Sequence, residues 1–391
     1  MVGAVIVREG QVLGEGWHRR LGDPHAEIEA LREADRRTND TRDATMYVTL
    51  EPCVHHGKTP PCAPELVNAG LRRVVIAVED PLWEDHARSQ PGGNGGRRGI
   101  TLLREAGVEV SVGCGRAEAV MLNAAFFKAG GSGLPLVTAK WAMSADGKIA
   151  THTGSSQWIS GEASRHSVHE LRGRVDAVIV GGGTAQTDDP LLTCRDAERR
   201  RVAVRVVMCG RRLPDLSSRL LQTVEEAPVL ICYPEDKPNA ELEKLEGLGC
   251  ELLPLPAAEN SRTGVRPEPV LRQLAEREAS RVLVEGGSEV LGAFFDEDLV
   301  DRAVIFCAPM VLGGAGAVTA VGGTGAGQVE EASMLRGDVF WGREMSELPA
   351  EPRVEVDISG RDVRISGWFS NPLNWGPEPY DDQTGYEEER E

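Results

Sequence analysis

The chain has 391 residues, of which 41% are hydrophobic and 27% charged, and its formal net charge at pH 7 is −18. This length and apolar content can fill two hydrophobic cores, whereas the acidic balance argues against the clustered Lys and Arg of a nucleic-acid surface. No stretch has the roughly 20 apolar residues of a membrane span, the start lacks a signal-peptide pattern, and eight cysteines are too few for a disulfide scaffold. We therefore expect a cytoplasmic, two-domain protein that contacts neither nucleic acid nor membrane.

The first part of the chain alternates between strand and helix patterns. Strand patterns occupy residues 1–7, 11–17, 45–50, 73–78 and 108–112, and helical patterns occupy residues 25–37, 63–69 and 100–106. On the first of these helices, Ile28, Leu31 and Ala34 fall on one face, which suits packing against a sheet. Strands that alternate with helices predict a layered α/β domain, which we assign to residues 1–128.

Four residues of this domain have the chemistry of a catalytic zinc site. His25, Cys53 and Cys62 supply one nitrogen and two thiolates, which leaves the fourth position of a tetrahedral zinc open for water. Glu27, two residues after His25, can lie beside the metal without binding it. A carboxylate there can move a proton from water to a leaving ammonia, which is the arrangement of a deaminase.

A closed zinc site that only stabilises a loop is the alternative to a catalytic one. Closed sites normally have four protein ligands, and His55 or His56 could be the fourth. The spacing of the cysteines is also unusual, because eight residues separate them where zinc deaminases normally have two. Glu27 argues for the catalytic interpretation.

The segment from Glu51 to Cys62, Glu-Pro-Cys-Val-His-His-Gly-Lys-Thr-Pro-Pro-Cys, resembles the zinc loop of the bifunctional RibD family of riboflavin biosynthesis. The resemblance implies a cytidine-deaminase-like, three-layer first domain that acts on a phosphorylated pyrimidine. It also implies four contacts to that substrate, namely His18, His55, Lys58 and Thr59. Relatives carry a helix and an Asn-Pro segment ahead of the first strand, so we expect either an upstream start codon or an incomplete deaminase site. Residues 82–98 depart from the family, look like a mobile loop and receive no assigned contact.

The second domain begins after a segment rich in small residues. Ala129-Gly-Gly-Ser-Gly-Leu-Pro135 has the composition of a flexible linker, which places the second domain at residues 136–375. Its strand patterns occupy residues 136–142, 175–180, 202–208, 228–232, 281–284 and 303–308, its helical pattern residues 268–279, and a glycine-rich loop residues 313–327. Residues 376–391 hold seven acids and one arginine, so we expect a disordered acidic tail.

Glycine-rich turns follow two strands of the second domain. Gly181-Gly-Gly-Thr184 and Glu285-Gly-Gly-Ser288 could let a backbone approach phosphate, although ordinary strand-end turns explain them as well. Neither is the G-x-G-x-x-G of a classical dinucleotide fold. However, Met143-Ser-Ala-Asp-Gly-Lys-Ile149 and Ser155-Ser-Gln-Trp-Ile-Ser160 resemble the opening of the reductase domain of the RibD family. That domain has a dihydrofolate-reductase-like α/β fold and uses NADPH.

The resemblance also implies residues for each ligand of the reductase. The NADPH contacts are Ala142, Trp158, Thr184, Asp188 and the backbone of Gly287, Ser288, Glu289, Val290, Leu291, Gly292 and Ala293. The substrate contacts are Ser156, Arg172, Leu192, Arg195 and Glu285, of which the two arginines suit a ribose phosphate. Gly210 stands where relatives have a cofactor-binding serine. Lys140 and Glu285 are the ionisable candidates near the reacting carbon, or else form a structural ion pair.

The sequence thus predicts a bifunctional enzyme of riboflavin synthesis with two cofactors, zinc and NADPH. Hydrolytic deamination of 2,5-diamino-6-(5-phosphoribosylamino)pyrimidin-4(3H)-one would precede reduction of the ribosyl side chain, which gives 5-amino-6-(5-phosphoribitylamino)uracil. Two alternatives remain: a reductase with a truncated, inactive zinc domain, and a nucleoside or tRNA-base deaminase with an appended domain. We expect a homo-oligomer.

Overall fold

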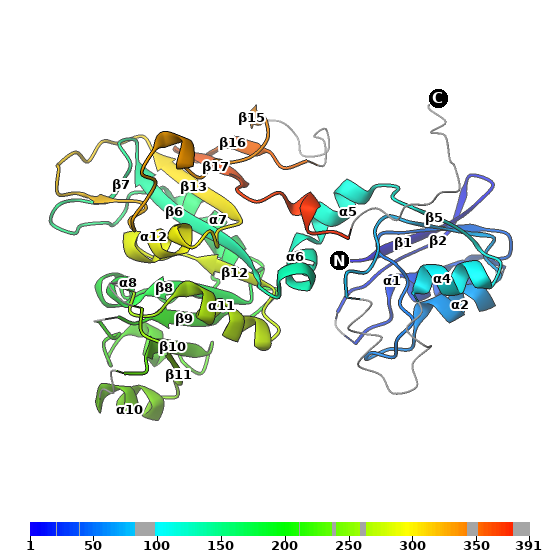
Figure 1. Ribbon diagram of the computed structural model, residues 1–391, viewed down its shortest axis with the longest axis horizontal. Helices are drawn as coiled ribbons and strands as arrows, with labels where there is room; N and C mark the ends of the chain where they lie inside the picture. The colour runs from blue at the N-terminus through cyan, green and yellow to red at the C-terminus, as the bar shows by residue number, and fades with distance from the viewer. Residues whose placement is uncertain are drawn as a thin grey trace. The chain divides into compact units, whose positions relative to one another are not determined.

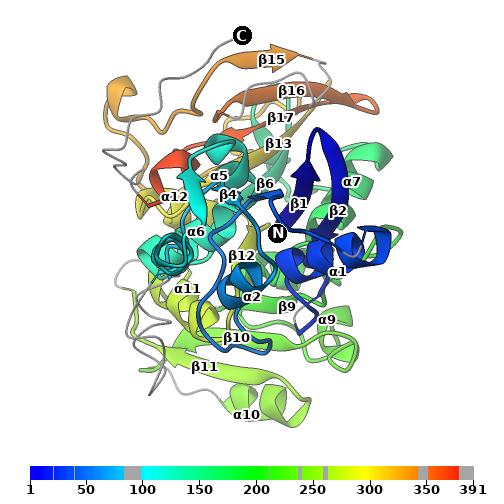
Figure 2. The ribbon, with the colours of Figure 1, turned by 90° about the vertical axis from the view of Figure 1, so that its right-hand side faces the viewer.

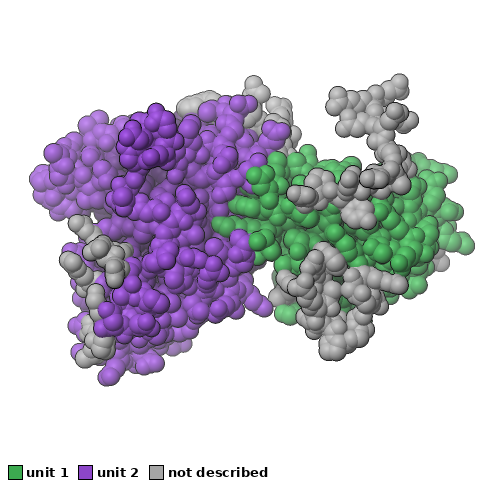
Figure 3. Space-filling model, viewed as in Figure 1, with its two compact units in different colours: residues 1–131, 372–391 green, residues 132–371 purple. Residues whose placement is uncertain are grey.

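The computed structural model describes the chain except residues 21, 39, 83–97, 211, 237–239, 259–262, 342–350 and 378–391. The chain forms two compact units, one of residues 1–131 with 372–391 and one of residues 132–371 (Figure 3). Residues 83–97 of the predicted mobile loop lie outside the described part, and so does the predicted acidic tail from residue 378. No helix among the described residues is long and apolar enough to cross a membrane.

Unit 1 is a layered α/β structure around a five-stranded sheet (Figure 1). The strand order is β2-β1-β3-β4-β5, with β1 antiparallel to both neighbours and β3, β4 and β5 parallel. Helices α1, α2 and α4 share one apolar core with the sheet, whereas α5 and α6 belong to a second cluster. The elements are β1 Gly3–Arg8, β2 Gln11–Trp17, α1 Ala26–Thr38, β3 Thr45–Val48, α2 Cys62–Asn68, β4 Arg73–Ile76, α4 Gly99–Glu105, β5 Glu109–Val112, α5 Arg116–Leu122 and α6 Ala124–Ser132.

Helix α1 lies unusually close to strand β2 because small residues face each other. A Cβ atom on Gly16 would come within 2.1 Å of the Ala26 carbonyl oxygen, and one on Gly14 within 2.3 Å of that of Ala30. The buried face of α1 is therefore Ala26, Glu27, Ala30 and Ala34. Of the three residues predicted to face the sheet, Ala34 is buried and the half-buried Leu31 packs against the core, whereas the prediction is wrong for Ile28, which is half-buried outside the core cluster. The spacing identified the helix, but helix–sheet contact through small side chains carries no strong apolar signal.

The expected linker is partly helical. Helix α6 continues to Ser132, and strand β6 starts at Leu136, so residues 129–132 complete a helix in place of a flexible connection. The chain also returns to unit 1 near its end. A short 3-10 helix, η3 Pro372–Asn374, precedes Trp375, which packs with the second apolar cluster of unit 1 around Phe127.

Unit 2 is built on a ten-stranded sheet of order β11-β10-β9-β8-β12-β6-β13-β17-β16-β15. The seven strands from β11 to β13 are parallel; β17 and β16 add an antiparallel hairpin, beside which β15 lies (Figure 2). Apolar cores cover both faces of the parallel part, as such sheets require. The strands of unit 2, of which β7 and β14 form a separate two-stranded sheet, are β6 Leu136–Ser144, β7 Lys148–Ala150, β8 Ala177–Gly181, β9 Val204–Met208, β10 Val229–Pro234, β11 Glu251–Leu255, β12 Arg281–Val284, β13 Arg302–Ala308, β14 Val318–Thr319, β15 Val339–Trp341, β16 Val354–Ser359 and β17 Asp362–Trp368.

Helices of unit 2 connect the parallel strands. They are α7 Glu162–Arg172, α8 Gly182–Asp188, α9 Arg219–Gln222, α10 Ala240–Gly247, α11 Pro267–Glu276, α12 Ser288–Asp296 and the 3-10 helix η1 Val329–Glu331. Strands β8 and β12 are parallel neighbours, so their carboxyl ends and the two glycine-rich turns lie together. This edge of the sheet is where a doubly covered parallel sheet normally binds its ligands.

Candidate active sites

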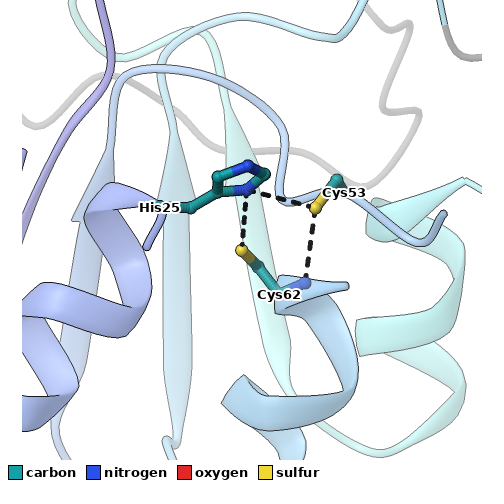
Figure 4. Close-up of side chains that lie close together, drawn as sticks. All are labelled: His25, Cys53 and Cys62. Carbon is teal, nitrogen blue, oxygen red and sulfur yellow. Dashed lines mark hydrogen bonds between the residues drawn. The ribbon is translucent and has the colours of Figure 1, made fainter. Parts of the chain in front are cut away.

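Three predicted zinc ligands of unit 1 meet at the ends of three elements (Figure 4). His25 directly precedes α1, Cys53 follows β3, and Cys62 is the first residue of α2. The Nδ1 atom of His25 lies 3.2 Å from the Cys62 sulfur and 3.4 Å from the Cys53 sulfur. The two cysteines are also linked through the backbone, because the Cys62 N–H points at the Cys53 sulfur and the Ala63 N–H donates to the Cys53 carbonyl.

The donor set and its spacing fit a tetrahedral zinc ion. Zinc–sulfur and zinc–nitrogen bonds of about 2.3 and 2.1 Å separate ligand atoms by about 3.5 Å in a tetrahedron. The three ligand atoms here lie within 4.8 Å of one another, and within the described residues no fourth His, Cys, Asp or Glu completes the group. The alternative of a closed site with His55 or His56 as fourth ligand is therefore not supported. Three protein ligands are typical of a catalytic zinc site.

The electrostatics of the two cysteines favour metal binding. Hydrogen bonding from Cys62 and from His25 lowers the pKa of Cys53 to about 4, despite its burial. The pKa of Cys62 is raised, chiefly because it donates to that thiolate. One thiolate is thus present at neutral pH, and the second forms when a cation displaces the thiol proton.

Glu27 is the buried acid–base candidate beside these ligands. Its side chain points from the first turn of α1, where it is 3% exposed. Burial raises the pKa of Glu27 to about 7. A carboxyl group with that pKa can both accept and donate a proton at neutral pH, which is the requirement for general acid–base catalysis.

The predicted substrate residues of unit 1 surround His25. The ring of His18 lies edge-on to that of His25 at 5.4 Å, with its Nδ1 atom 3.2 Å from the Pro24 carbonyl. The Thr59 hydroxyl is 3.0 Å from His25 Nε2, so it fixes the ring from the side opposite the sulfurs. One cavity, of about 600 Å³, is lined by Lys58, Thr59 and His25. His55, half-buried, lies in the same zinc loop.

In unit 2, the Glu285 carboxylate pairs with two cations, one from a helix and one from a strand. Arg172 at the end of α7 donates two hydrogen bonds to the Glu285 carboxylate, of 2.5 and 2.9 Å. Lys140 of β6 lies 2.8 Å from the same carboxylate. Burial alone would raise the pKa of Glu285, but the charges of Arg172 and Lys140 lower it to about 2. All three predicted residues therefore share one charged cluster, which lies at the carboxyl end of β12 and beside the middle of β6.

Asp188 and Ser156 lie next to this cluster. The Ser156 hydroxyl donates to Asp188 at 3.2 Å. Burial raises the pKa of Asp188, while Ser156 and the positive charge of Lys140 act in the opposite direction. The predicted cofactor residue Asp188 and the predicted substrate residue Ser156 are thus in direct contact, as adjoining ligand sites require.

The loop after α8 holds two further predicted substrate residues, Leu192 and Arg195. Leu192 is 2% exposed and has a positive φ of 56°, an uncommon backbone conformation for leucine. Together with Arg172 and Arg195 it lines a cavity of about 110 Å³. The backbone N–H of Arg195 points at His169 Nδ1, 3.2 Å away, which fixes the loop against α7. Because Arg172 is committed to Glu285, Arg195 is the better placed of the two arginines to grip a phosphate.

The predicted cofactor residues surround the two glycine-rich turns. The Thr184 hydroxyl accepts the Gly287 N–H at 3.1 Å, which joins the two turns. Val290 and Leu291 are buried in the core, so only the backbone of this part of α12 can face a cofactor. A Cβ atom on Gly286 would come within 2.5 Å of Val290, so this glycine also permits tight turn–helix packing. This packing agrees with the interpretation of ordinary strand-end turns, and the approach of a cofactor phosphate to them stays a prediction.

Trp158 is exposed, with 65% of its surface accessible. The guanidinium of Arg165 stacks over its ring at 4.8 Å. Ala142 stands on β6 two residues beyond Lys140 and on the same side of the strand. Gly210 follows β9 beside Cys209 and presents no side chain to a ligand.

Comparisons with known proteins agree with both sites. Residues 1–78 match the family described as the cytidine and deoxycytidylate deaminase zinc-binding region, and residues 135–338 match the RibD C-terminal domain. The riboflavin biosynthesis protein RibD of Aquifex aeolicus is 39% identical over 335 residues, which cover 86% of this chain and 87% of that protein. This chain belongs to the RibD family. RibD of Escherichia coli is 34% identical over 80% of this chain and 82% of its own length.

Solved structures of RibD-family proteins cover almost the whole chain. RibD of Acinetobacter baumannii superposes with a TM-score of 0.72 at 31% identity, over 94% of this chain and 91% of its own. The Thermotoga maritima protein, named as a deaminase and reductase, superposes with a TM-score of 0.71 at 32% identity and the same coverage. The predicted fold class is thereby confirmed. As a RibD protein, the chain is a zinc-dependent deaminase and an NADPH-dependent reductase in one polypeptide.

Some residues around the RibD sites were not found from the sequence. On α7, Arg165 and His169 flank predicted ligand residues and lie on one face with Arg172, so the helical spacing 165, 169, 172 was the available signal. Glu51, directly before Pro52-Cys53, is almost completely buried and accepts hydrogen bonds from distant segments. A carboxylate adjoining a metal ligand was the signal there.

Proposed function

We propose that unit 1 of this RibD-family enzyme removes ammonia from the substrate and that unit 2 then reduces the product. The T. maritima relative is named diaminohydroxyphosphoribosylaminopyrimidine deaminase and 5-amino-6-(5-phosphoribosylamino)uracil reductase. We assign the same substrates to this chain. The supporting observation is Glu27, a buried carboxyl with a pKa near neutrality beside a three-ligand zinc site.

In the deamination, His25, Cys53 and Cys62 would hold zinc, which when bound supplies a Lewis acid for water attack. Glu27 accepts one proton from the attacking water and delivers it to the departing amino group. The carbon–nitrogen bond breaks, and ammonia leaves. A carbonyl forms at the same carbon, and the second water proton ends on the adjoining ring nitrogen. Burial keeps Glu27 protonatable at neutral pH, so the same group can act first as base and then as acid.

Substrate binding in unit 1 would use the cavity beside His25. Lys58, which is exposed at the cavity wall, supplies positive charge for a phosphate, and His55 adds a donor from the same loop. His18, next to the His25 ring, faces the pyrimidine in this proposal. Thr59 acts through His25, because its hydroxyl partners the His25 ring.

In the reduction, NADPH supplies a hydride, which adds to the first carbon of the opened ribosyl group. Lys140, held by Glu285, is the group placed to give the accompanying proton. Arg172 keeps the Glu285 carboxylate charged, and Arg195 with Leu192 binds the phosphoribosyl end. Trp158, Ala142, Thr184, Asp188 and the backbone from Gly287 to Ala293 form the NADPH side. Alignment of the two reactants is the main contribution of these residues.

A two-substrate assay of wild type and Glu27→Gln tests this division of labour. Offered the diamino pyrimidine with NADPH, wild type should release ammonia and oxidise NADPH. Glu27→Gln should lose ammonia release by at least about 100-fold, the usual loss of a general acid–base, yet oxidise NADPH normally with the deaminated substrate. Undiminished ammonia release by the variant would refute the role of Glu27. Wild-type turnover of only the deaminated substrate would favour a reductase with an inactive zinc domain, and deamination of a tRNA base would favour the other alternative.

The domain boundaries stay a prediction: a deaminase domain at residues 1–128, a linker at 129–135, a reductase domain at 136–375 and an acidic tail at 376–391. The expected cytoplasmic location, the homo-oligomer and the absence of nucleic-acid or membrane partners are predictions as well. Small-molecule substrates are consistent with the RibD-type sites in both units.

A further inference from the structure

Glu51 is a buried carboxylate outside the zinc ligand group, two residues before Cys53. Its side chain is 2% exposed. The carboxylate accepts the backbone N–H of Asp80 and that of Ile100, each at 3.2 Å, and a 2.8 Å hydrogen bond from the Arg98 guanidinium. One side chain thus joins the segment after β4, the start of α4 and the zinc-ligand segment.

Backbone contacts extend from Glu51 through Pro52 and Cys53 to the second ligand helix. Glu51 donates its own N–H to the Val78 carbonyl at 2.9 Å. On the other side, α4 begins so close that a Cβ atom on Gly99 would come within 2.0 Å of the Pro52 carbonyl oxygen. Cys53 then accepts the Ala63 N–H at its carbonyl, 3.0 Å away, which reaches the first turn of α2. Pro52-Cys53 is therefore clamped between two segments before it meets the second ligand helix.

A carboxylate in this place needs an explanation beyond packing. Burying a charge is unfavourable unless it is fully hydrogen-bonded, and an apolar residue of similar volume would fill the same space without that cost. What an apolar residue cannot do is bind the two backbone N–H groups and Arg98 at once. The carboxylate therefore fixes the relative position of three backbone segments, one of which carries Cys53.

We propose that Glu51 is a positioning residue of the deaminase site, which holds the Pro52-Cys53 segment in the geometry needed for zinc binding and catalysis. This role rests on the proposed deamination for its effect on turnover. Its effect on the metal site does not depend on the identity of the substrate. Outer partners of metal ligands typically change metal affinity or activity by about 10- to 100-fold, and we expect an effect of that size.

Glu51→Gln and Glu51→Ala in the full-length holoenzyme test the proposal. We expect zinc to transfer to a chelator at least about tenfold faster than from wild type. The cobalt-substituted variants should show an altered thiolate-to-metal absorption band, and the kcat for ammonia release should fall more than KM changes. NADPH oxidation with the deaminated substrate, measured on the same samples, should stay within twofold of wild type, because it takes place in unit 2.

Asp40→Asn is the matched control. Asp40 belongs to the same unit, accepts the Arg42 backbone N–H at 3.1 Å and pairs with Arg8 at 3.1 Å, and neither partner adjoins a zinc ligand in sequence. Its variant should match wild type in zinc release, cobalt spectrum and kcat. If the Glu51 variants release zinc at the wild-type rate with an unchanged cobalt spectrum, the positioning role is refuted, whatever their activity.

Gly99→Ala provides a second route to the same answer, should the Glu51 variants fail to fold. Its added methyl carbon would lie 2.0 Å from the Pro52 carbonyl oxygen and 3.4 Å from the Glu51 Cγ atom, so the Pro52-Cys53 segment or the start of α4 must move. Faster zinc release from this variant supports the clamp, and wild-type release overturns it. If wild type shows no deamination but the variants still lose zinc faster, the proposed activity fails while the positioning role stands.

Discussion

Glu285 shows how a buried charge in unit 2 is made stable by its partners. The side chain is 5% exposed and contacts Arg172 and Lys140, which come from α7 and β6. Burial opposes the charged form, but the two cations reverse that effect and lower the pKa to about 2, against an ordinary 4.5. Because the folded state holds the carboxylate charged more strongly than the unfolded state does, the cluster links folding to pH.

We predict that acid weakens wild type more than Glu285→Gln. A carboxyl whose pKa is lowered on folding contributes stability above its unfolded pKa, and this contribution is lost as pH falls toward the folded value. Between pH 6 and pH 4, the free energy of unfolding of unit 2 should therefore fall by about 1 kcal/mol more in wild type than in Glu285→Gln. Urea unfolding, followed by amide hydrogen exchange in the strands of unit 2, measures the difference.

At pH 7, the free energy of unfolding of Glu285→Gln should be about 3–5 kcal/mol below that of wild type, because two cations remain buried without their carboxylate. Glu268→Gln on α11 is the control, because Glu268 pairs with Arg272 at an exposed position where solvent screens the pair. Its unfolding should follow the wild-type pH dependence. Parallel pH profiles for wild type and Glu285→Gln would contradict the charge assignment at Glu285.

At the scale of elements, the contact between α1 and β2 positions both His25 and Glu27. Gly14 and Gly16 on the strand face Ala26, Ala30 and Ala34 on the helix, so the two backbones approach without side chains between them. His25 and Glu27 flank Ala26, the point of closest approach. The position of the acid–base group relative to the zinc ligands therefore depends on two glycines of a neighbouring strand.

Gly16→Ala should displace the start of α1. Its methyl carbon would lie 2.1 Å from the Ala26 carbonyl oxygen and 2.4 Å from the Ala30 nitrogen, so the helix must move. We expect a loss of about 1–3 kcal/mol in the stability of unit 1, the usual effect of overpacking, together with weaker zinc binding and slower ammonia release. Thermal unfolding and zinc titration would measure this, with unchanged NADPH oxidation as the internal reference.

Gly3→Ala on the adjoining strand β1 is the matched substitution, because its nearest neighbour would be a carbonyl oxygen 3.9 Å away, an ordinary contact. It should leave zinc binding and ammonia release unchanged. If Gly16→Ala behaves like Gly3→Ala, the close approach of α1 does not control the site.

The sequence predicted what short motifs and chemistry encode. His25, Cys53 and Cys62 could be found because few arrangements of soft ligands have another use. Apolar runs predicted all strands of the five-stranded sheet and six of the ten in the larger sheet, but not β11, β15, β16 or β17. Partners far apart in sequence could not, since spacing carries no information about them: Arg172 and Glu285 are 113 residues apart, and Glu51 and Arg98 are 47 apart.

The buried faces of the helices were also difficult to predict from the sequence. The apolar residues Ile28 and Leu31 of α1 are half-buried along the cavity beside His25, whereas alanines form the face that packs on the sheet. Spacing alone favours large side chains as the core, and small side chains that permit close approach are overlooked. The same limitation concealed the return of the chain to unit 1, because Leu373 and Trp375 lie in a short segment without periodicity.

At the scale of the whole molecule, this return makes unit 1 depend on residues near the end of the chain. Trp375 packs with Phe127 and Val120, and the Lys128 ammonium lies 5.7 Å from its ring centre. The deaminase unit is thus completed by a segment that follows the reductase unit in sequence. A chain ended after Asn371 should therefore lose stability in unit 1, although every strand and helix of unit 2 is retained.

We predict that ending the chain after Asn371 lowers the unfolding free energy of unit 1 by about 2–4 kcal/mol, because the apolar contacts of Leu373 and Trp375 disappear. Zinc should be released at a lower temperature on heating, while NADPH oxidation with the deaminated substrate persists. A chain ended after Pro377 keeps both side chains and the Arg116 hydrogen bond to the Pro377 carbonyl, and should release zinc at the wild-type temperature. Equal release temperatures for the two shortened chains would show that the returning segment does not stabilise the deaminase unit.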